Sequence, residues 1–97
     1  MTKYVFRPAA ADDVERAHAW YENERTGLGE EFLEEVHTTV QSVLVMPESY
    51  PVVRRQTRRA LVPRFPYALF YRVVSDTIVF VACFHTSRNP TVWQRRR

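Results

Sequence analysis

The spacing of apolar residues changes from helical to strand-like at residues 47–51, a stretch that begins and ends with proline. From residue 9 to this stretch, apolar residues recur at the three- and four-residue intervals of amphipathic helices. After it, they form short runs rich in aromatic and β-branched residues, which is typical of strands. A chain of 97 residues has room for only one hydrophobic core. We therefore expect a single α+β domain over residues 1–97.

The first half predicts one strand and two helices. Residues 4–8 are aromatic and β-branched and predict a strand that the closing proline ends. The apolar spacing predicts helices over residues 9–23 and 28–46, which a short loop joins into an antiparallel hairpin. We expect Asp12 and Asp13 in the first turn of the first helix, where negative charge is favourable.

The second half predicts strands over residues 58–62, 67–74 and 77–84. The last run is apolar throughout, so we expect it to be buried on both faces. Only two residues separate it from the run before it, which favours an antiparallel hairpin. The tail, residues 86–97, is polar, basic and expected to be irregular. The order β-α-α-β-β-β predicts a helical hairpin packed on one face of a small antiparallel sheet, with the other face left for a partner.

Charge is divided unevenly between the two halves. Residues 1–50 carry four cations and ten anions, whereas residues 51–97 carry ten arginines and only one acidic residue, Asp76. Thirteen of the fourteen cations are arginines, whose planar guanidinium groups suit carboxylates and phosphates. The asymmetry indicates an acidic partner, either nucleic acid or an acidic protein segment.

Several classes of site are disfavoured by composition. The chain has two glycines, Gly27 and Gly29, which is too few for a glycine-rich phosphate loop. One cysteine and three widely spaced histidines argue against a disulfide and a zinc site, so we expect no metal and no cofactor. Cys83 is interpreted as a small buried apolar residue rather than a nucleophile. No apolar run is long enough to span a membrane, and we expect a cytoplasmic protein.

Five arginines lie close together around the first strand of the second half, and they support two interpretations. One is a solvated edge strand that its charge protects from aggregation. The other, which we favour, is a docking surface, because cations without a nearby anion repel one another and gain from an acidic partner. Neighbours in a strand point to opposite faces, so the adjacent Arg58 and Arg59 cannot belong to the same patch. The cluster consists of Arg54, Arg55, Arg58, Arg59 and Arg64.

Four glutamates near the start of the second helix are interpreted as a solvated helix face rather than a metal site. They also offer partners for the basic half of the same molecule. They are Glu30, Glu31, Glu34 and Glu35.

Two segments of the second half carry a family resemblance. Residues 65–73 read Phe-Pro-Tyr-Ala-Leu-Phe-Tyr-Arg-Val, and residues 85–93 read His-Thr-Ser-Arg-Asn-Pro-Thr-Val-Trp. Together they resemble the ParE branch of the RelE/ParE toxin superfamily. Pro8, Asp13 and Pro47 also match the family at the ends of the expected helices.

The resemblance implies the toxin half of a type II toxin–antitoxin pair. ParE-like members are implied to inhibit DNA gyrase, whereas RelE-like members cut messenger RNA on the ribosome. In either branch a cognate antitoxin wraps an acidic or amphipathic C-terminal segment around the toxin. We expect a ParE-like gyrase inhibitor that acts by binding, with a RelE-like ribonuclease or an inactive interaction module as alternatives.

The chain departs from the ribonuclease branch. That branch relies on lysines, on an arginine that begins the third strand, and on a tyrosine near the end of the chain. Here Lys3 is the only lysine, while Ala68 and Trp93 stand at the other two positions. Cleavage of RNA without a metal needs a base, an acid and cations together. His85 and Arg88 would supply only part of this set.

The resemblance and the position in the chain add three binding candidates: Arg72, Arg88 and Trp93. Trp93 is interpreted first as an apolar plug that fastens the tail to the sheet, and second as a stacking platform for bases. We expect His85 to hydrogen-bond the chain as it leaves the sheet, unless it acts as a base.

Overall fold

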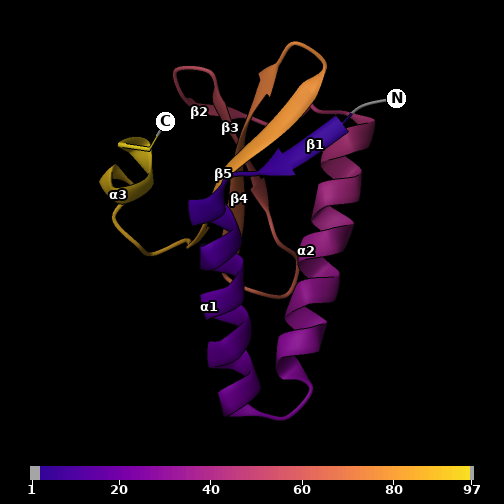
Figure 1. The fold of residues 1–97 in the computed structure, drawn as a ribbon, viewed down its shortest axis with the longest axis vertical. Helices are drawn as coiled ribbons and strands as arrows, with labels where there is room; N and C mark the ends of the chain where they lie inside the picture. Colours follow the sequence, from indigo (N-terminus) through magenta and orange to yellow (C-terminus); the bar gives the residue numbers. More distant parts are fainter. Residues whose placement is uncertain (1–2, 97) are drawn as a thin grey trace.

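The computed structural model describes residues 3–96 and has the expected α+β class (Figure 1). Two long helices pack on one face of a five-stranded sheet, and a short third helix lies apart from them near the C-terminus. The elements in chain order are β1 (Lys3–Phe6), α1 (Pro8–Glu24), α2 (Leu28–Val45), β2 (Val52–Arg54), β3 (Thr57–Leu61), β4 (Tyr67–Val74), β5 (Thr77–His85) and α3 (Thr91–Gln94).

The predicted helices and strands are confirmed to within two residues at each end, but two short elements were not predicted. Strand β2 has three residues, all exposed, and helix α3 has four. Neither is long enough to produce a periodic apolar pattern. The prediction of an irregular tail was wrong for α3, which a tertiary contact of its tryptophan holds in place.

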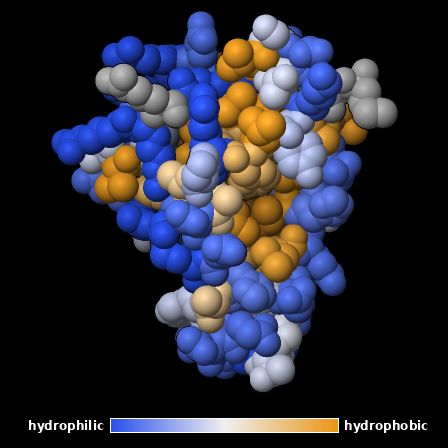
Figure 2. All heavy atoms as spheres, in the orientation of Figure 1, coloured by the Kyte–Doolittle hydropathy of each residue, from blue (hydrophilic) through white to orange (hydrophobic). Residues whose placement is uncertain are grey.

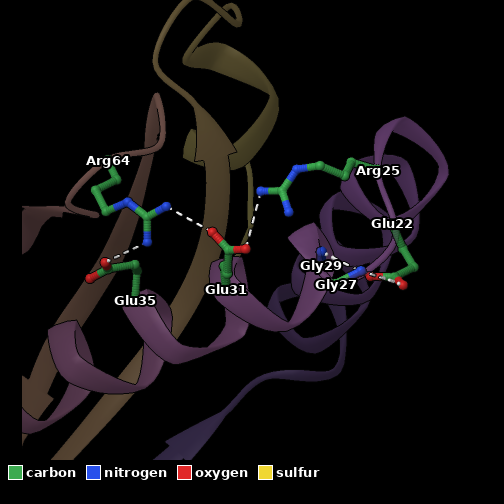
Figure 3. Close-up of polar contacts among 7 residues, drawn as sticks. All are labelled: Glu22, Arg25, Gly27, Gly29, Glu31, Glu35 and Arg64. Atoms are coloured by element: carbon green, nitrogen blue, oxygen red, sulfur yellow. Dashed lines mark hydrogen bonds and ion pairs between the residues drawn. The ribbon is translucent and has the colours of Figure 1, made fainter.

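The loop between α1 and α2 is held by one carboxylate (Figure 3). Glu22 accepts hydrogen bonds from the backbone N–H groups of Gly27, at 2.9 Å, and Gly29, at 3.0 Å. These bonds, that of Gly27 first, lower the pKa of Glu22. Gly27 has a φ of 91°, a conformation that glycine adopts without strain. At Gly29 a Cβ atom would lie 2.7 Å from the His18 ring, so Gly29 is required by the close approach of the two helices, whereas Gly27 is favoured by its backbone conformation.

The sheet has the strand order β1-β5-β4-β3-β2 and is mixed. Strands β3, β4 and β5 pair antiparallel with one another, as the sequence predicts, and the unpredicted β2 pairs antiparallel with β3. Strand β1 pairs with β5 in parallel, which corrects the expectation of a wholly antiparallel sheet. The physical reason is that the helical hairpin separates β1 from the other strands, so no tight turn forces it to run antiparallel.

Apolar side chains cover both faces of the sheet. Residues 78–84 of β5 are all buried, which confirms the prediction of a strand buried on both faces. One layer packs under α1 and α2 and includes Phe32 and Phe80. The smaller layer lies on the opposite face and includes Phe70 and Trp93. The face expected to be free for a partner is therefore partly covered by the tail of the same chain.

One stretch of β5 has an edge that no strand covers. Strand β1 ends at Phe6, opposite Phe80, and beyond this point two side chains take the place of a neighbouring strand. The N–H of Cys83 donates to Asp13 Oδ2 at 3.0 Å, and Arg96 Nη1 donates to the Val81 carbonyl at 3.1 Å. The backbone polar groups of this edge are thus satisfied from α1 and from the tail.

Asp13 and Arg96 also bind each other. Arg96 donates to both carboxylate oxygens of Asp13, at 2.6 and 3.1 Å, and the Asp13 side chain is only 2% exposed. The expectation that Asp12 and Asp13 lie in the first helical turn was wrong, because α1 begins at Pro8 and has no acidic residue in its first turn. Asp13 lies one turn further on, where it faces β5 instead of capping the helix.

The substitution Asp13→Asn is expected to lower the free energy of unfolding by about 2–3 kcal/mol, because it leaves the partly buried Arg96 charge without its buried counterion. Urea denaturation measures this loss. The matched control is Asp12→Asn, which removes the same charge at an exposed position and is expected to change stability by less than about 0.5 kcal/mol. Equal effects of the two substitutions would contradict this role of Asp13.

Candidate functional site

A large cleft lies on the sheet face opposite α1 and α2. It has a volume of about 540 Å³ and is bounded by the β2–β3 turn, by β4 and β5, and by the C-terminal tail. Five of its ten lining residues are arginines, and none is acidic. We call this cleft the basic groove. Its lining residues are Arg54, Arg55, Gln56, Thr57, Arg72, Val81, Trp93, Gln94, Arg95 and Arg96.

Two turns of the chain bring these arginines together. Arg54 pairs with Thr57 across a two-residue hairpin turn, in which Arg55 has a φ of 52°. On the other side, the Trp93 ring stacks on Phe70 with the ring centres 4.2 Å apart. Trp93 is 4% exposed, which confirms its interpretation as a plug that fastens the tail to the sheet. This plug positions Arg95 at the groove.

The charge of the groove is largely uncompensated. Arg96 is paired with Asp13 at the far side of the tail. Within residues 3–96 the other four arginines of the groove form no ion pair with any acidic side chain. Four guanidinium groups in one concave surface create a positive potential that attracts anions. These four are Arg54, Arg55, Arg72 and Arg95.

Two members of the predicted arginine cluster have partners within the chain. Arg58 Nη1 donates to the carbonyls of Tyr50, at 2.6 Å, and Glu48, at 3.1 Å. Arg64 donates to Glu31 at 2.8 Å and to Glu35 at 3.4 Å (Figure 3). The premise that no anion lies near the five arginines was therefore wrong for Arg64.

The remaining arginine of the cluster, Arg59, is exposed and pairs in register with Phe70, whereas Arg58 pairs with Tyr71. Phe70 and Tyr71 belong to the apolar layers on opposite faces of the sheet. Arg58 and Arg59 therefore point to opposite faces, as predicted.

The glutamates of α2 divide between structural and solvated roles. Glu31 joins Arg64 to Arg25, and these two guanidinium groups, that of Arg64 first, lower the pKa of Glu31. Glu30 lies 3.4 Å from His18, and Glu34 is exposed. The pairing of this acidic face with the basic half is confirmed for Arg64.

His85 and Arg88 lie outside the basic groove. His85 Nδ1 accepts a hydrogen bond from the Ser87 N–H at 3.1 Å, as expected for a residue that holds the chain leaving the sheet. The Arg88 guanidinium carbon lies 4.2 Å from the centre of the Phe84 ring. Arg88 lines a separate cavity of about 240 Å³, together with Asp13, Arg16, Ala17, Trp20, Tyr67 and Cys83.

Comparison with known proteins identifies the family. The sequence matches the family described as ParE toxin of type II toxin-antitoxin system, parDE, over residues 4–90. The chain belongs to the ParE toxin family. Among solved structures, a chromosomal ParDE toxin–antitoxin system from P. aeruginosa has a similar fold, with a TM-score of 0.66 and 19% sequence identity over 88% of this chain and 96% of that one. A comparison with curated protein sequences finds no match.

Part of the basic groove lies beyond the residues that the ParE family match covers. The family match ends at residue 90, whereas Trp93, Arg95 and Arg96 follow it. Trp93 is predicted from the family resemblance, but the arginines beside it carry no sequence signal beyond that of a basic tail. Asp13 was also missed as a partner of the tail. The terminal Arg97 lies outside the described residues.

Other kinds of site find no support in the part of this ParE-family chain that the structure describes. No three His, Cys, Asp or Glu side chains lie together as metal ligands there. None of the described helices is long and apolar enough to cross a membrane. Cys83 is buried, as predicted, and its burial raises the pKa of the thiol to about 12.

The substitution Trp93→Ala is expected to lower the free energy of unfolding by about 3 kcal/mol and to detach the tail, because it removes the ring that stacks on Phe70. Chemical denaturation measures the first effect, and faster trypsin cleavage after Arg95 and Arg96 measures the second. The neighbouring substitution Val92→Ala removes an exposed side chain and serves as the control. A tail that stays resistant to trypsin in the Trp93 variant would contradict this description of the plug.

Proposed function

We propose that this ParE-family toxin inhibits DNA gyrase by binding to it, and that a cognate antitoxin neutralises the toxin. Membership of a toxin–antitoxin family supports the partner. The observation that carries the binding mechanism is the basic groove, in which four arginines lack an internal counterion among the described residues. Arginines held in a concave surface provide recognition without any chemical step.

The arrangement of His85 and Arg88 favours binding over RNA cleavage. His85 Nδ1 is engaged by the Ser87 backbone, and the Ser87 hydroxyl lies 2.8 Å from the same nitrogen. Arg88 is stacked on an aromatic ring at the open edge of β5, away from the basic groove. A ribonuclease needs its base and several cations directed at one phosphate, whereas here the groove arginines line a different cavity from Arg88.

A different surface suits the antitoxin. Figure 2 shows apolar side chains gathered along the middle of the face that carries β1. At the end of the sheet formed by β1 and the β4–β5 turn, four large apolar residues are exposed. Tyr4 and Val73 both pair with Ile78 and lie on the helix-covered face, whereas Val5 and Val74 lie on the opposite face. We call these residues, which flank the end of the sheet on both faces, the apolar end; they are Tyr4, Val5, Val73 and Val74.

The outer edge of β1 adds a second means of binding. Strand β1 is an outermost strand of the sheet and, among residues 3–96, pairs with β5 alone. An amphipathic segment gains hydrogen bonds by adding to such an edge and buries its apolar residues on the side chains beside it. We place the antitoxin segment on the apolar end for this reason.

Purified toxin is expected to block supercoiling by DNA gyrase and to leave messenger RNA on programmed ribosomes uncut. Gel assays of plasmid topology and of RNA length measure the two activities. The antitoxin, added in excess, should restore supercoiling. Codon-position cuts that disappear in an Arg88→Ala variant would overturn the binding mechanism in favour of a ribonuclease.

The substitution Val5→Lys is expected to weaken antitoxin binding by about 10- to 150-fold, the equivalent of losing one buried aliphatic side chain. Val5 is 50% exposed, so the fold tolerates the lysine. Isothermal titration calorimetry measures the dissociation constant. Val92→Lys adds the same charge at an exposed position of α3 and should bind the antitoxin normally. Equal weakening in both variants would place the antitoxin elsewhere.

A further inference from the structure

The basic groove and the apolar end differ in chemistry, and the difference restricts what each one binds. The apolar side chains that line the groove, Val81 and Trp93, are almost fully buried. The groove surface is more polar than apolar, and no apolar side chain of the lining is exposed in it. An amphipathic protein segment gains much of its affinity by packing against exposed apolar side chains, and the groove offers none of these. A ligand whose binding groups are anionic along its whole length fits the groove better.

The groove also lacks a platform for unstacked bases. Proteins that bind single-stranded nucleic acids stack successive bases on exposed aromatic rings. The aromatic residue of the groove, Trp93, is stacked on Phe70 and is 4% exposed. Its ring face is thus occupied within the protein. Contacts in the groove are directed at phosphates and not at bases.

We propose that the basic groove binds the phosphate backbone of duplex DNA. Arg54 and Arg55 on the β2–β3 turn face Arg72 and Arg95 as walls of one cleft. Guanidinium groups form paired hydrogen bonds with phosphate oxygens, and duplex DNA carries about one charge per 1.7 Å of its axis. The choice of duplex DNA over other phosphate polymers rests on the proposed function, because gyrase acts while bound to duplex DNA.

Two residues that do not contact the DNA hold the groove in shape. Arg96 ties the tail to Asp13 and to the Val81 carbonyl, and its charge is compensated there. Trp93 fixes α3 against the sheet. Arg95, between them, is exposed and has no acidic partner among the described residues, so it is directed at the ligand.

Fluorescence anisotropy of a labelled short DNA duplex, titrated with the full-length toxin at several salt concentrations, tests the proposal. Four arginine–phosphate contacts predict a slope of about −3.6 for the logarithm of the binding constant against that of the salt concentration. The affinity should then fall about 150-fold between about 50 and 200 mM salt. The double variant Arg72→Gln/Arg95→Gln should halve the slope, to about −1.8.

The matched control is Lys3→Gln/Arg7→Gln, which removes two exposed charges outside the groove and leaves the same net charge as the groove variant. It should keep the wild-type slope. A second groove variant, Arg54→Gln/Arg95→Gln, repeats the test with an arginine of β2 in place of Arg72 of β4. Circular dichroism and urea denaturation confirm that each variant is folded.

Three results would overturn the proposal: no binding of the duplex by the wild-type toxin, equal slopes for groove and control variants, or a groove that binds a polyglutamate peptide or single-stranded RNA in preference to duplex DNA. The assay contains no gyrase, so its outcome is independent of the supercoiling test. A toxin that binds duplex DNA through the groove but leaves supercoiling intact supports the groove and contradicts the proposed target.

Discussion

The contact between Asp13 and Arg96 covers the stretch of the β5 edge that β1 leaves open. Strand β5 is the centre of the core, yet β1 covers its outer edge only as far as Phe80. Beyond that point the carboxylate of Asp13 accepts the Cys83 N–H, and Arg96 covers the Val81 carbonyl. A polar edge buried without such partners would destabilise the fold. The same contact holds the C-terminal tail against the sheet. The stability of the fold and the shape of the basic groove therefore both depend on the pair of Asp13 and Arg96.

The two faces of the sheet then acquire different roles. One face is covered by the helical hairpin, whose acidic surface is partly neutralised by Arg25 and Arg64. The other face is covered only by a small apolar layer under Trp93, with four uncompensated arginines around it. This separation explains how a chain of 97 residues presents a basic groove and an apolar end as distinct surfaces. It also gives the two proposed partners, DNA in the gyrase complex and the antitoxin, separate places to bind.

Local pattern was sufficient to predict most of the fold. The aromatic and β-branched runs over 67–74 and 77–84 predict β4 and β5 closely, and the apolar spacing predicts both long helices. The pairing of β1 with β5 was not predicted, because parallel pairing depends on the path of the helical hairpin and not on the strand itself.

The candidate site was predicted only in part, because its essential contacts join residues distant in the sequence. Asp13 contacts Cys83 and Arg96, which are 70 and 83 residues away. Arg64 belongs to the arginine cluster in the sequence, but it binds Glu31, 33 residues away, and does not line the basic groove. Arg54, Arg55 and Arg72 were named from the sequence, and only the fold joins them to Arg95.

The central claim is that the groove completed by the tail is the surface with which the toxin acts. Gyrase supercoiling in the presence of Arg72→Gln/Arg95→Gln toxin, compared with the charge-matched Lys3→Gln/Arg7→Gln toxin, tests it most directly. The account predicts that the groove variant loses inhibition while it still binds the antitoxin, and that the control inhibits like the wild type. Full inhibition by the groove variant, at the same toxin concentration as the control, would contradict the account.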